Sequence, residues 1–274
     1  MRRLGKDARE LIQARELTLN LVRRDLKVRH RGSFLGMLWS LTNPLLVVGL
    51  YYVIFTYILQ TRPASDLPRP DGQPVPFAVY FFSGYIVWNL FANSAAEATN
   101  SVIGSGYLLR KVYFPRAILP LSTVLSATVT FAFELAVLVI VVAATVGAPS
   151  LQILWAPVIV AVAVVLSYGM ALLLSALTVF LRDVGHFIAV LLQMWFWSTP
   201  VVYSLQFVAK NEQILRLVKL NPMTGLVVSF RNVVVLNRPP SLTLLAYDIG
   251  VALVLLAVGA AVFQRWQRLF AEIV

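Results

Sequence analysis

Four basic side chains near the start of the chain have the chemistry to bind an anionic ligand. They are Arg24, Lys27, Arg29 and Arg31, two or three positions apart. An arginine guanidinium presents a fork of N–H donors that matches phosphate oxygens, and a lysine adds a compact positive charge. The group is therefore suited to a pyrophosphate at the level of lipid headgroups. Cations that only anchor a chain at the cytoplasmic face of a membrane would look the same, so both interpretations stay open.

A second group of residues is suited to binding another protein. Between the helix breakers Gly104 and Pro120, the sequence predicts a short surface helix. It combines an apolar and aromatic part with a basic rim, made by Leu108, Leu109, Tyr113 and Phe114 and by Arg110, Lys111 and Arg116. Apolar anchors surrounded by charged residues are typical of protein interfaces. A simple turn at the membrane surface is the alternative.

Aromatic side chains with polar tips are concentrated in three apolar stretches. Such rings can line the path of a sugar chain, because they offer flat apolar faces and hydrogen-bonding groups together. The candidates for this role are Tyr51, Tyr52, Tyr85 and Trp88. A belt at the membrane interface, or packing between helices, would explain each of them equally simply.

Three carboxylates, Glu97, Glu134 and Asp248, fall inside apolar stretches. An ionised carboxylate that faces lipid is costly, so each should face protein, water or a translocation path. A structural role, with the acid protonated or hydrogen-bonded, is the alternative.

The sequence offers little for catalysis. There is no cysteine, the two histidines are His30 and His186, and the carboxylates are scattered, whereas an enzyme site needs clustered acids, histidines or a metal. The phosphate-binding pattern G-x-x-x-x-G-K-[ST] is absent, since the nearest string, Gly5-Lys6-Asp7, lacks the first glycine and the hydroxyl. We therefore predict no catalytic residue, no metal site and no cofactor in this chain, and we expect it not to be an enzyme.

These residues are set in a chain that is built for a membrane. Hydrophobic residues make up 59% of it and charged residues 13%, about half the share of a soluble domain. Residues 32–61 carry no charge and as a helix would be about 45 Å long, enough to cross a bilayer core of about 30 Å. Ten Lys and Arg precede this run, which predicts a cytoplasmic amino terminus. Lipid headgroups, rather than a nucleic acid, are the expected counter-charge for the net charge of +11.

The apolar runs predict an all-α integral membrane protein with six transmembrane helices and both termini in the cytoplasm. We expect a leader, residues 1–33, followed by a transmembrane domain, residues 34–274. The spans are predicted near 34–60, 77–100, 117–146, 151–181, 187–208 and 241–263. The third and fourth are separated by a short turn at Gly147 to Ser150, where glycine and proline break the helix.

Two further elements complete this outline. Residues 210–240 are too apolar for an ordinary loop and too short to cross twice, which predicts an external re-entrant hairpin, with a plain surface loop as the alternative. The leader is amphipathic and should lie flat on the membrane, although a helix packed on a soluble partner gives the same pattern. Its predicted apolar face consists of Ala8, Leu11, Ile12, Leu19, Val22 and Leu26.

Four stretches resemble, in order, one family of membrane proteins. They are residues 29–39 followed by Asn43-Pro44-Leu45, residues 108–116, Arg182-Asp183-Val184 running on to residues 198–203, and residues 220–224 with Phe230-Arg231. Together they are similar to the permease subunits of ABC-2 type exporters of polysaccharide, teichoic acid and O-antigen, over nearly the whole chain.

The resemblance implies a homodimer of permeases bound to two copies of a cytoplasmic ABC ATPase, which would hold the ATP and Mg²⁺. The cargo would be a polyprenyl-diphosphate glycan, such as wall teichoic acid or O-antigen, moved from the cytoplasmic leaflet across the bacterial plasma membrane. In this family the ATPase docks on the loop that corresponds to residues 104–120. An ABC-2 drug or antibiotic exporter is the main alternative; a secondary transporter would need internal repeats that are not visible here.

Overall fold

The computed structural model describes residues 14–29, 39–58, 69–70, 72, 74–148 and 150–273. In these residues the chain forms helices joined by turns, without a β-strand, so the predicted all-helical class is confirmed. Among the predicted site residues, Arg31 lies outside the described residues.

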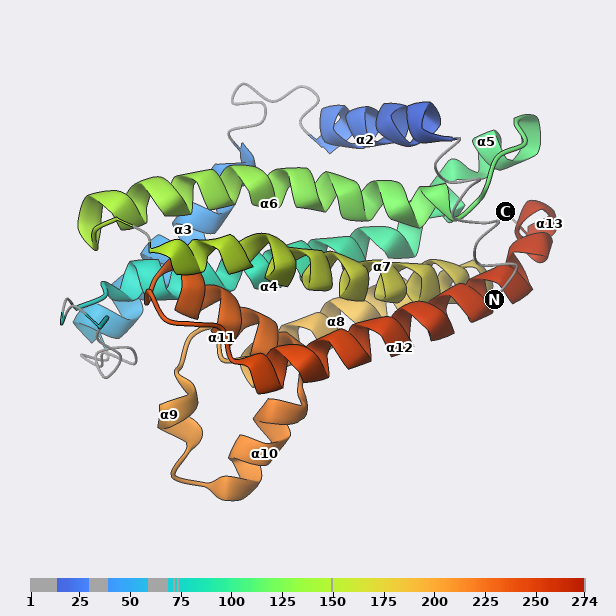
Figure 1. The fold of residues 1–274 in the computed structure, drawn as a ribbon. Helices are drawn as coiled ribbons and strands as arrows, with labels where there is room; N and C mark the ends of the chain where they lie inside the picture. Colours follow the sequence, from blue (N-terminus) through green and yellow to red (C-terminus); the bar gives the residue numbers. More distant parts are fainter. Residues whose placement is uncertain are drawn as a thin grey trace.

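Four long helices form the frame of the molecule (Figure 1). They are α4 (Phe77–Ser101), α6 (Ile118–Thr145), α7 (Ala156–Phe180) and α12 (Leu242–Trp266). α7 packs along α12, and α4 lies against both α6 and α7. Their bounds are close to the predicted ranges, because long apolar runs without proline in their interiors leave few other ways to satisfy the backbone.

α7 and α12 cross with their backbones in contact. A Cβ atom on Gly169 of α7 would lie 2.6 Å from the backbone nitrogen of Leu256, and a Cβ on Gly259 of α12 would overlap the carbonyl oxygen of Gly169. Glycine is therefore required on both sides of this crossing, as in the small-residue contacts of membrane helices.

Three helical segments in the described residues are long and apolar enough to cross a membrane. They are Ile118–Thr145, Leu151–Phe180, which includes the short 3-10 helix η4 (Leu151–Trp155), and Leu242–Leu269. Two shorter apolar helices, Thr42–Val53 and Val184–Ser198, accompany them.

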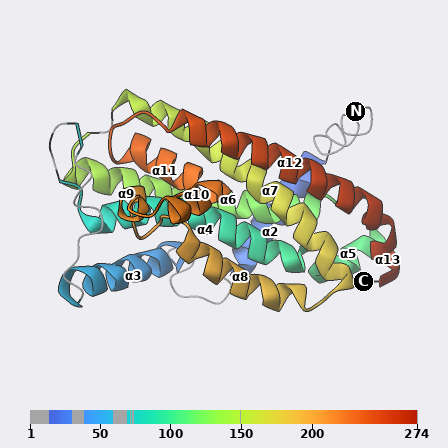
Figure 2. The ribbon, with the colours of Figure 1, turned by 90° about the horizontal axis from the view of Figure 1, so that it is seen from below.

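In its described part the first predicted span is helical, since α3 (Trp39–Val53) continues as a π-helix, η2 (Ile54–Ile58). The helix in the fifth predicted span, α8, spans Val184–Ser198 and ends earlier than expected. The predicted helix 187–208 is wrong in its second half, since Pro200 follows α8 and a turn separates it from α9 (Leu205–Val208). Figure 2 shows α3 and α8 along one edge of the molecule and α12 along the other.

One end of the frame, which we call the basic end, gathers short helices around a second apolar core. η3 (Ile103–Ser105) and α5 (Gly106–Lys111) follow α4, while η5 (Gln267–Leu269) and α13 (Phe270–Ile273) follow α12. α2 (Arg15–Arg29) lies beside α6 (Figure 1). The second core includes Leu21, Leu109, Phe114, Phe263 and Phe270. The basic residues of this end are Arg110, Lys111, Arg116, Arg182, Arg265 and Arg268.

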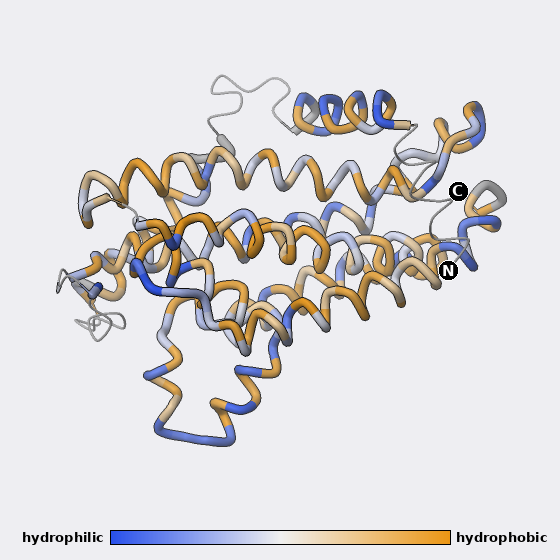
Figure 3. Tube along the Cα trace, viewed as in Figure 1, coloured by the Kyte–Doolittle hydropathy of each residue, from blue (hydrophilic) through white to orange (hydrophobic). Residues whose placement is uncertain are grey.

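The opposite end, which we call the far end, is closed by the segment between α8 and α12. α10 (Glu212–Leu220) is mostly exposed and hydrophilic on its outer side, whereas α11 (Pro222–Val234) is buried against α4, α7 and α12. Figure 3 shows hydrophilic residues gathered around α9 and α10 and at the basic end, with hydrophobic residues along the helices between them.

Candidate functional site

The basic cluster lies on the last turns of α2. Thr18, Leu21 and Val22 are buried, and α2 packs with this face on α6. Of the predicted apolar face, Val22 is buried by the bundle and Leu19 is 51% exposed, while Ala8, Leu11 and Ile12 lie outside the described residues. Lys27 is exposed, and Arg29 is the last residue of the helix.

Arg24 is paired with a neighbouring carboxylate. Its Nη2 and Nε atoms donate to the Oδ1 atom of Asp25, at 2.9 and 3.1 Å. A guanidinium that is already paired with a carboxylate offers less charge to a diphosphate than an unpaired one. This pairing makes Arg24 a weaker candidate for the diphosphate than the sequence suggested.

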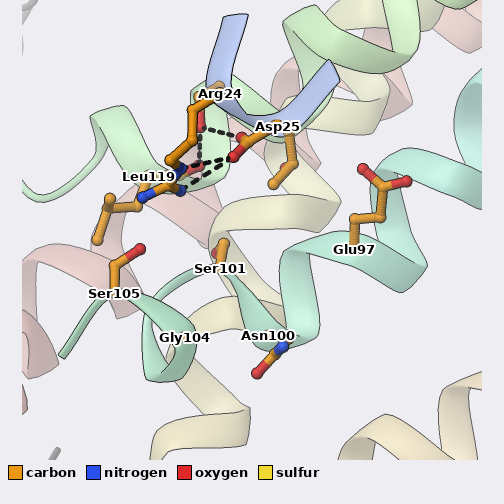
Figure 4. Close-up of a pocket in the computed structure, with 10 residues that line it drawn as sticks. Arg24, Asp25, Glu97, Asn100, Ser101, Gly104, Ser105 and Leu119 are labelled. Atoms are coloured by element: carbon orange, nitrogen blue, oxygen red, sulfur yellow. Dashed lines mark hydrogen bonds and ion pairs between the residues drawn. The ribbon is translucent and has the colours of Figure 1, made fainter. Parts of the chain in front are cut away.

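A cavity of about 500 Å³ opens between α2, the end of α4 and the start of α6. Figure 4 shows Arg24 and Asp25 reaching from α2 toward the segment that carries Ser101, Gly104 and Ser105, with Glu97 farther along α4. Among the described residues, the lining consists of Arg24, Asp25, Glu97, Asn100, Ser101, Gly104, Ser105, Leu119, Ser122 and Thr123. The sequence analysis named Arg24, Glu97 and the loop 104–120 for other roles, and it did not predict the cavity, because the cavity draws serine, threonine and glycine from three separate elements.

A polar stripe on α4 runs from this cavity toward the middle of the bundle. Tyr85, Asn89, Asn93 and Glu97 follow one another every fourth residue, and all four are partly exposed in an otherwise largely buried helix. Residues four apart lie on the same face of a helix, so this spacing was a signal available in the sequence. Asn89 Nδ2 donates to Glu134 Oε1 of α6 at 3.0 Å, which explains how that buried acid is accommodated.

The predicted docking segment contains residues that are buried in the second core and residues that are exposed at the surface. Leu109 and Phe114 are buried in the second core, while Leu108 is partly buried. Tyr113 stands free of the protein surface, 102% exposed, and Tyr107, which the sequence prediction missed, is 72% exposed. Lys111 Nζ lies 2.7 Å from the Tyr107 hydroxyl and 4.3 Å from its ring centre. Arg110 is exposed and Arg116 is partly buried.

The four predicted channel aromatics occupy different environments. Tyr51 stacks on Phe81, with ring centres 4.7 Å apart, and Tyr85 stacks on the same Phe81 at 5.5 Å. We call this row of rings the aromatic seam. Trp88 is 5% exposed, whereas Tyr52 is 38% exposed and its ring centre lies 6.1 Å from that of Tyr57. The seam continues into α8 through Trp195, Phe196 and Trp197, so it joins α3, α4 and α8 within one chain.

Asp248 is buried between α12 and α11. Its carboxylate lies against Gly225, where a Cβ atom would overlap Oδ2, and neither of its oxygens has a hydrogen-bond partner among the described residues. In the part of the chain that the structure describes, no three His, Asp or Glu side chains gather as a metal site would require.

Arg231 of α11 is the residue that holds the far end together, and the sequence prediction gave it no role. It is 2% exposed, and it donates to the carbonyl oxygens of Tyr80, Pro200 and Val201 at 3.2, 3.1 and 2.9 Å. Its guanidinium also lies 3.6 Å from the centre of the Tyr80 ring. An arginine inside an apolar run was the available signal, because a buried cation must have partners.

Comparison with known proteins gives one consistent family. A family model described as ABC-2 type transporter matches residues 16–235. The O-antigen export system permease protein RfbA of Myxococcus xanthus is 31% identical over 264 residues, which is 96% of this chain and 97% of that protein. A protein of the same name from Klebsiella pneumoniae is 28% identical over 259 residues, 94% of this chain and 95% of its own length.

Proposed function

We infer, because this chain belongs to the ABC-2 type transporter family, that it is the membrane subunit of a polysaccharide exporter. The observation that carries this proposal is similarity to O-antigen export permeases along nearly the whole of both chains. The chain is thus a multi-pass membrane protein, and the family resemblance predicted from its four stretches is confirmed.

We propose six crossings with the basic end in the cytoplasm. The three long apolar segments, α4 with 25 residues, and α3 with η2 supply five of them. α8 has 15 residues and would be about 22 Å long, short of a core of about 30 Å, so the turn after Ser198 would complete the sixth. The basic residues of the end that holds α5 and α13 favour this orientation.

The buried α11 supports the proposal of an external re-entrant hairpin. Broken backbone is tolerated at membrane depth where protein covers it, and α11 is covered by α4, α7 and α12. α10, with its exposed polar side chains, would remain at the outer surface.

The motor is proposed to be a separate ABC ATPase that binds ATP and Mg²⁺ and docks at α5. Tyr107 and Tyr113 supply exposed aromatic anchors there, with Arg110 and Lys111 beside them. Aromatic residues with arginine are the common hot spots of interfaces. Two permeases and two ATPases would form the working unit.

The cargo is proposed to be a polyprenyl-diphosphate glycan that enters from the cytoplasmic leaflet in the bacterial plasma membrane. Lys27, Arg29 and Arg31 remain as candidates for the diphosphate, since Arg24 is paired with Asp25. The names of the relatives favour a glycan over a drug or antibiotic.

The test is to purify the chain with its ATPase, reconstitute it in liposomes and measure ATP hydrolysis. Polyprenyl-diphosphate glycans should stimulate hydrolysis, whereas a panel of amphiphilic drugs should not. Stimulation by the drugs alone would favour the alternative exporter. Replacing Arg29 and Arg31 with Gln should weaken glycan stimulation by about 1.5–3 kcal/mol for each charge-assisted bond lost; unchanged export would leave only the anchoring role.

A further inference from the structure

We propose that the cavity between α2, α4 and α6 binds the first sugars of the exported glycan, next to its diphosphate. This inference rests on the proposed function and deepens it, because it assigns the sugar and the diphosphate to different places. The volume of about 500 Å³ falls within the range of about 300–1,000 Å³ found for small-molecule sites.

The chemistry of the lining fits hydroxyl groups. Ser101 and Thr123 each donate their proton to a carbonyl of their own helix, both at 2.8 Å. The Ser122 hydroxyl lies 2.9 Å from the Leu119 carbonyl of its own helix and 3.2 Å from Asp25 Oδ2 of α2. Their oxygens keep a lone pair that can accept from a ligand hydroxyl. The Asn100 amide and the Glu97 carboxylate add further hydrogen-bonding capacity, so the wall can both donate to and accept from a sugar.

The pairing of Arg24 with Asp25 argues against the diphosphate as the occupant. Arg24 is the cation among the described residues of the lining, and Asp25 already holds it at 2.9 Å. The pair therefore offers little net positive charge to a diphosphate. Lys27, two positions after Asp25, is exposed on another side of α2, so a diphosphate bound there would stay outside the cavity while the sugar enters.

The position of the cavity fits the direction of transport. The cavity lies at the Glu97 end of the polar stripe formed by Tyr85, Asn89, Asn93 and Glu97, and Glu97 belongs to the cavity wall as well as to the stripe. A glycan that starts in the cavity would find hydrogen-bonding side chains at each turn of α4, and then the aromatic seam near Tyr85. Amide and phenol groups bind a neutral sugar without the strength that would stall it.

Cysteine protection tests occupancy directly, because the natural chain contains no cysteine. Ser101→Cys is placed in the full chain in lipid nanodiscs, and the rate of its modification by a small thiol reagent is measured. Undecaprenyl-diphosphate glycan extracted from the source membranes should slow the reaction about tenfold at a concentration ten times its dissociation constant. Undecaprenyl diphosphate without sugar should leave the rate unchanged. Equal protection by both lipids, or by neither, overturns the proposal.

Filling the cavity gives a second measurement. A Cβ atom on Gly104 meets nothing closer than the Asn100 side chain at 3.6 Å, so the backbone accepts Gly104→Leu while the added side chain occupies the cavity. The concentration of glycan that gives half-maximal ATPase stimulation should rise about tenfold or more, the effect of blocking one site. Gly250→Leu is the matched control, since nothing lies within 4 Å of a Cβ there, and it should behave as the natural chain.

The outcomes separate this inference from the function on which it rests. Glycan stimulation of the natural chain, without protection of Ser101→Cys and without an effect of Gly104→Leu, overturns the sugar site and leaves the exporter intact. Absence of any glycan stimulation in the natural chain overturns both.

Discussion

Polar side chains at the far end and at the basic end are used in opposite ways. At the far end, Arg231 bonds to carbonyls of α4 and of the turn after α8, and Asn221 joins that turn to α11. At the basic end, Ser101 and Thr123 bond within their own helices, and Ser122 bonds to its own helix and also to Asp25 of α2. Bonds between elements fix the fold, whereas bonds within a helix leave the same side chains able to contact a ligand.

The comparison predicts its largest effect at Arg231. Arg231→Ala removes the donor from the carbonyls of Tyr80, Pro200 and Val201 and should lower the free energy of unfolding by about 3–5 kcal/mol. Unfolding in mixed detergent micelles measures this loss. The control is Arg216→Ala, whose exposed pair with Glu212 should contribute about 0.3–0.5 kcal/mol. Equal losses for the two variants would contradict the role given to Arg231.

Two asparagines at helix N-termini sharpen the same contrast. Asn221 caps α11 and also accepts from Trp195 Nε1 and donates to Thr199 Oγ1, both at 2.8 Å. Asn211 caps α10 by bonds to its own helix alone. Asn221→Ala should cost about 1–3 kcal/mol, because it leaves buried partners unsatisfied, and Asn211→Ala about 0.5–1 kcal/mol. The difference between their unfolding free energies is the measured quantity, and a difference of zero would argue against long-range bonding as the cause.

A third prediction concerns the exposed aromatics of the basic end. Tyr113→Ala should weaken binding of the ATPase about tenfold without changing the unfolding of the permease, since Tyr113 contacts little within the chain. Binding is measured by titrating the purified ATPase onto the permease in nanodiscs. Phe207→Ala, which removes an aromatic side chain that is 69% exposed at the far end, is the control and should bind normally. Weaker binding of Phe207→Ala together with normal binding of Tyr113→Ala would contradict docking at the basic end and place the ATPase at the far end.

The smallest effect on stability is expected at the cavity wall. Thr123→Ala should lower the unfolding free energy by less than about 1 kcal/mol, because its hydroxyl bonds to the Pro120 carbonyl of its own helix. It should nevertheless raise the half-saturating glycan concentration. Thr128→Ala removes a comparable bond within α6 outside the cavity and should change neither quantity beyond a few tenths of a kcal/mol.

The four long helices of the frame could be predicted from the sequence, whereas the turn after α8 and its bonds to Arg231 could not. Residues 77–100 and 117–146 were predicted close to α4 and α6, because an apolar run in a membrane must form a helix. The second half of the predicted helix 187–208 failed, since its backbone carbonyls bond instead to Arg231, about thirty residues later. Leu21, which the predicted apolar face did not include, is buried on α6, because only packing decides which side of α2 the bundle covers.

The candidate site was predictable where one element carries it. The basic residues on α2 and the aromatic and basic residues around α5 stand in continuous segments, so the sequence could propose them as candidates, and their roles stay predictions. Tyr107 was missed, as it precedes the run that was considered. The cavity was missed because three elements supply it, and none of its serines stands out in the sequence.

The glycine contact between α7 and α12 has a mechanical consequence. The backbones of Gly169 in α7 and Leu256 in α12 are in contact. If one of these helices rotated or slid by one turn, a larger side chain would have to fit where a glycine now lies. These two helices must therefore move as one rigid body through every cycle of transport. Any opening of the path has to come from the elements that touch these two helices less closely. α3 and α8 pack mainly on α4, so moving them costs the least free energy.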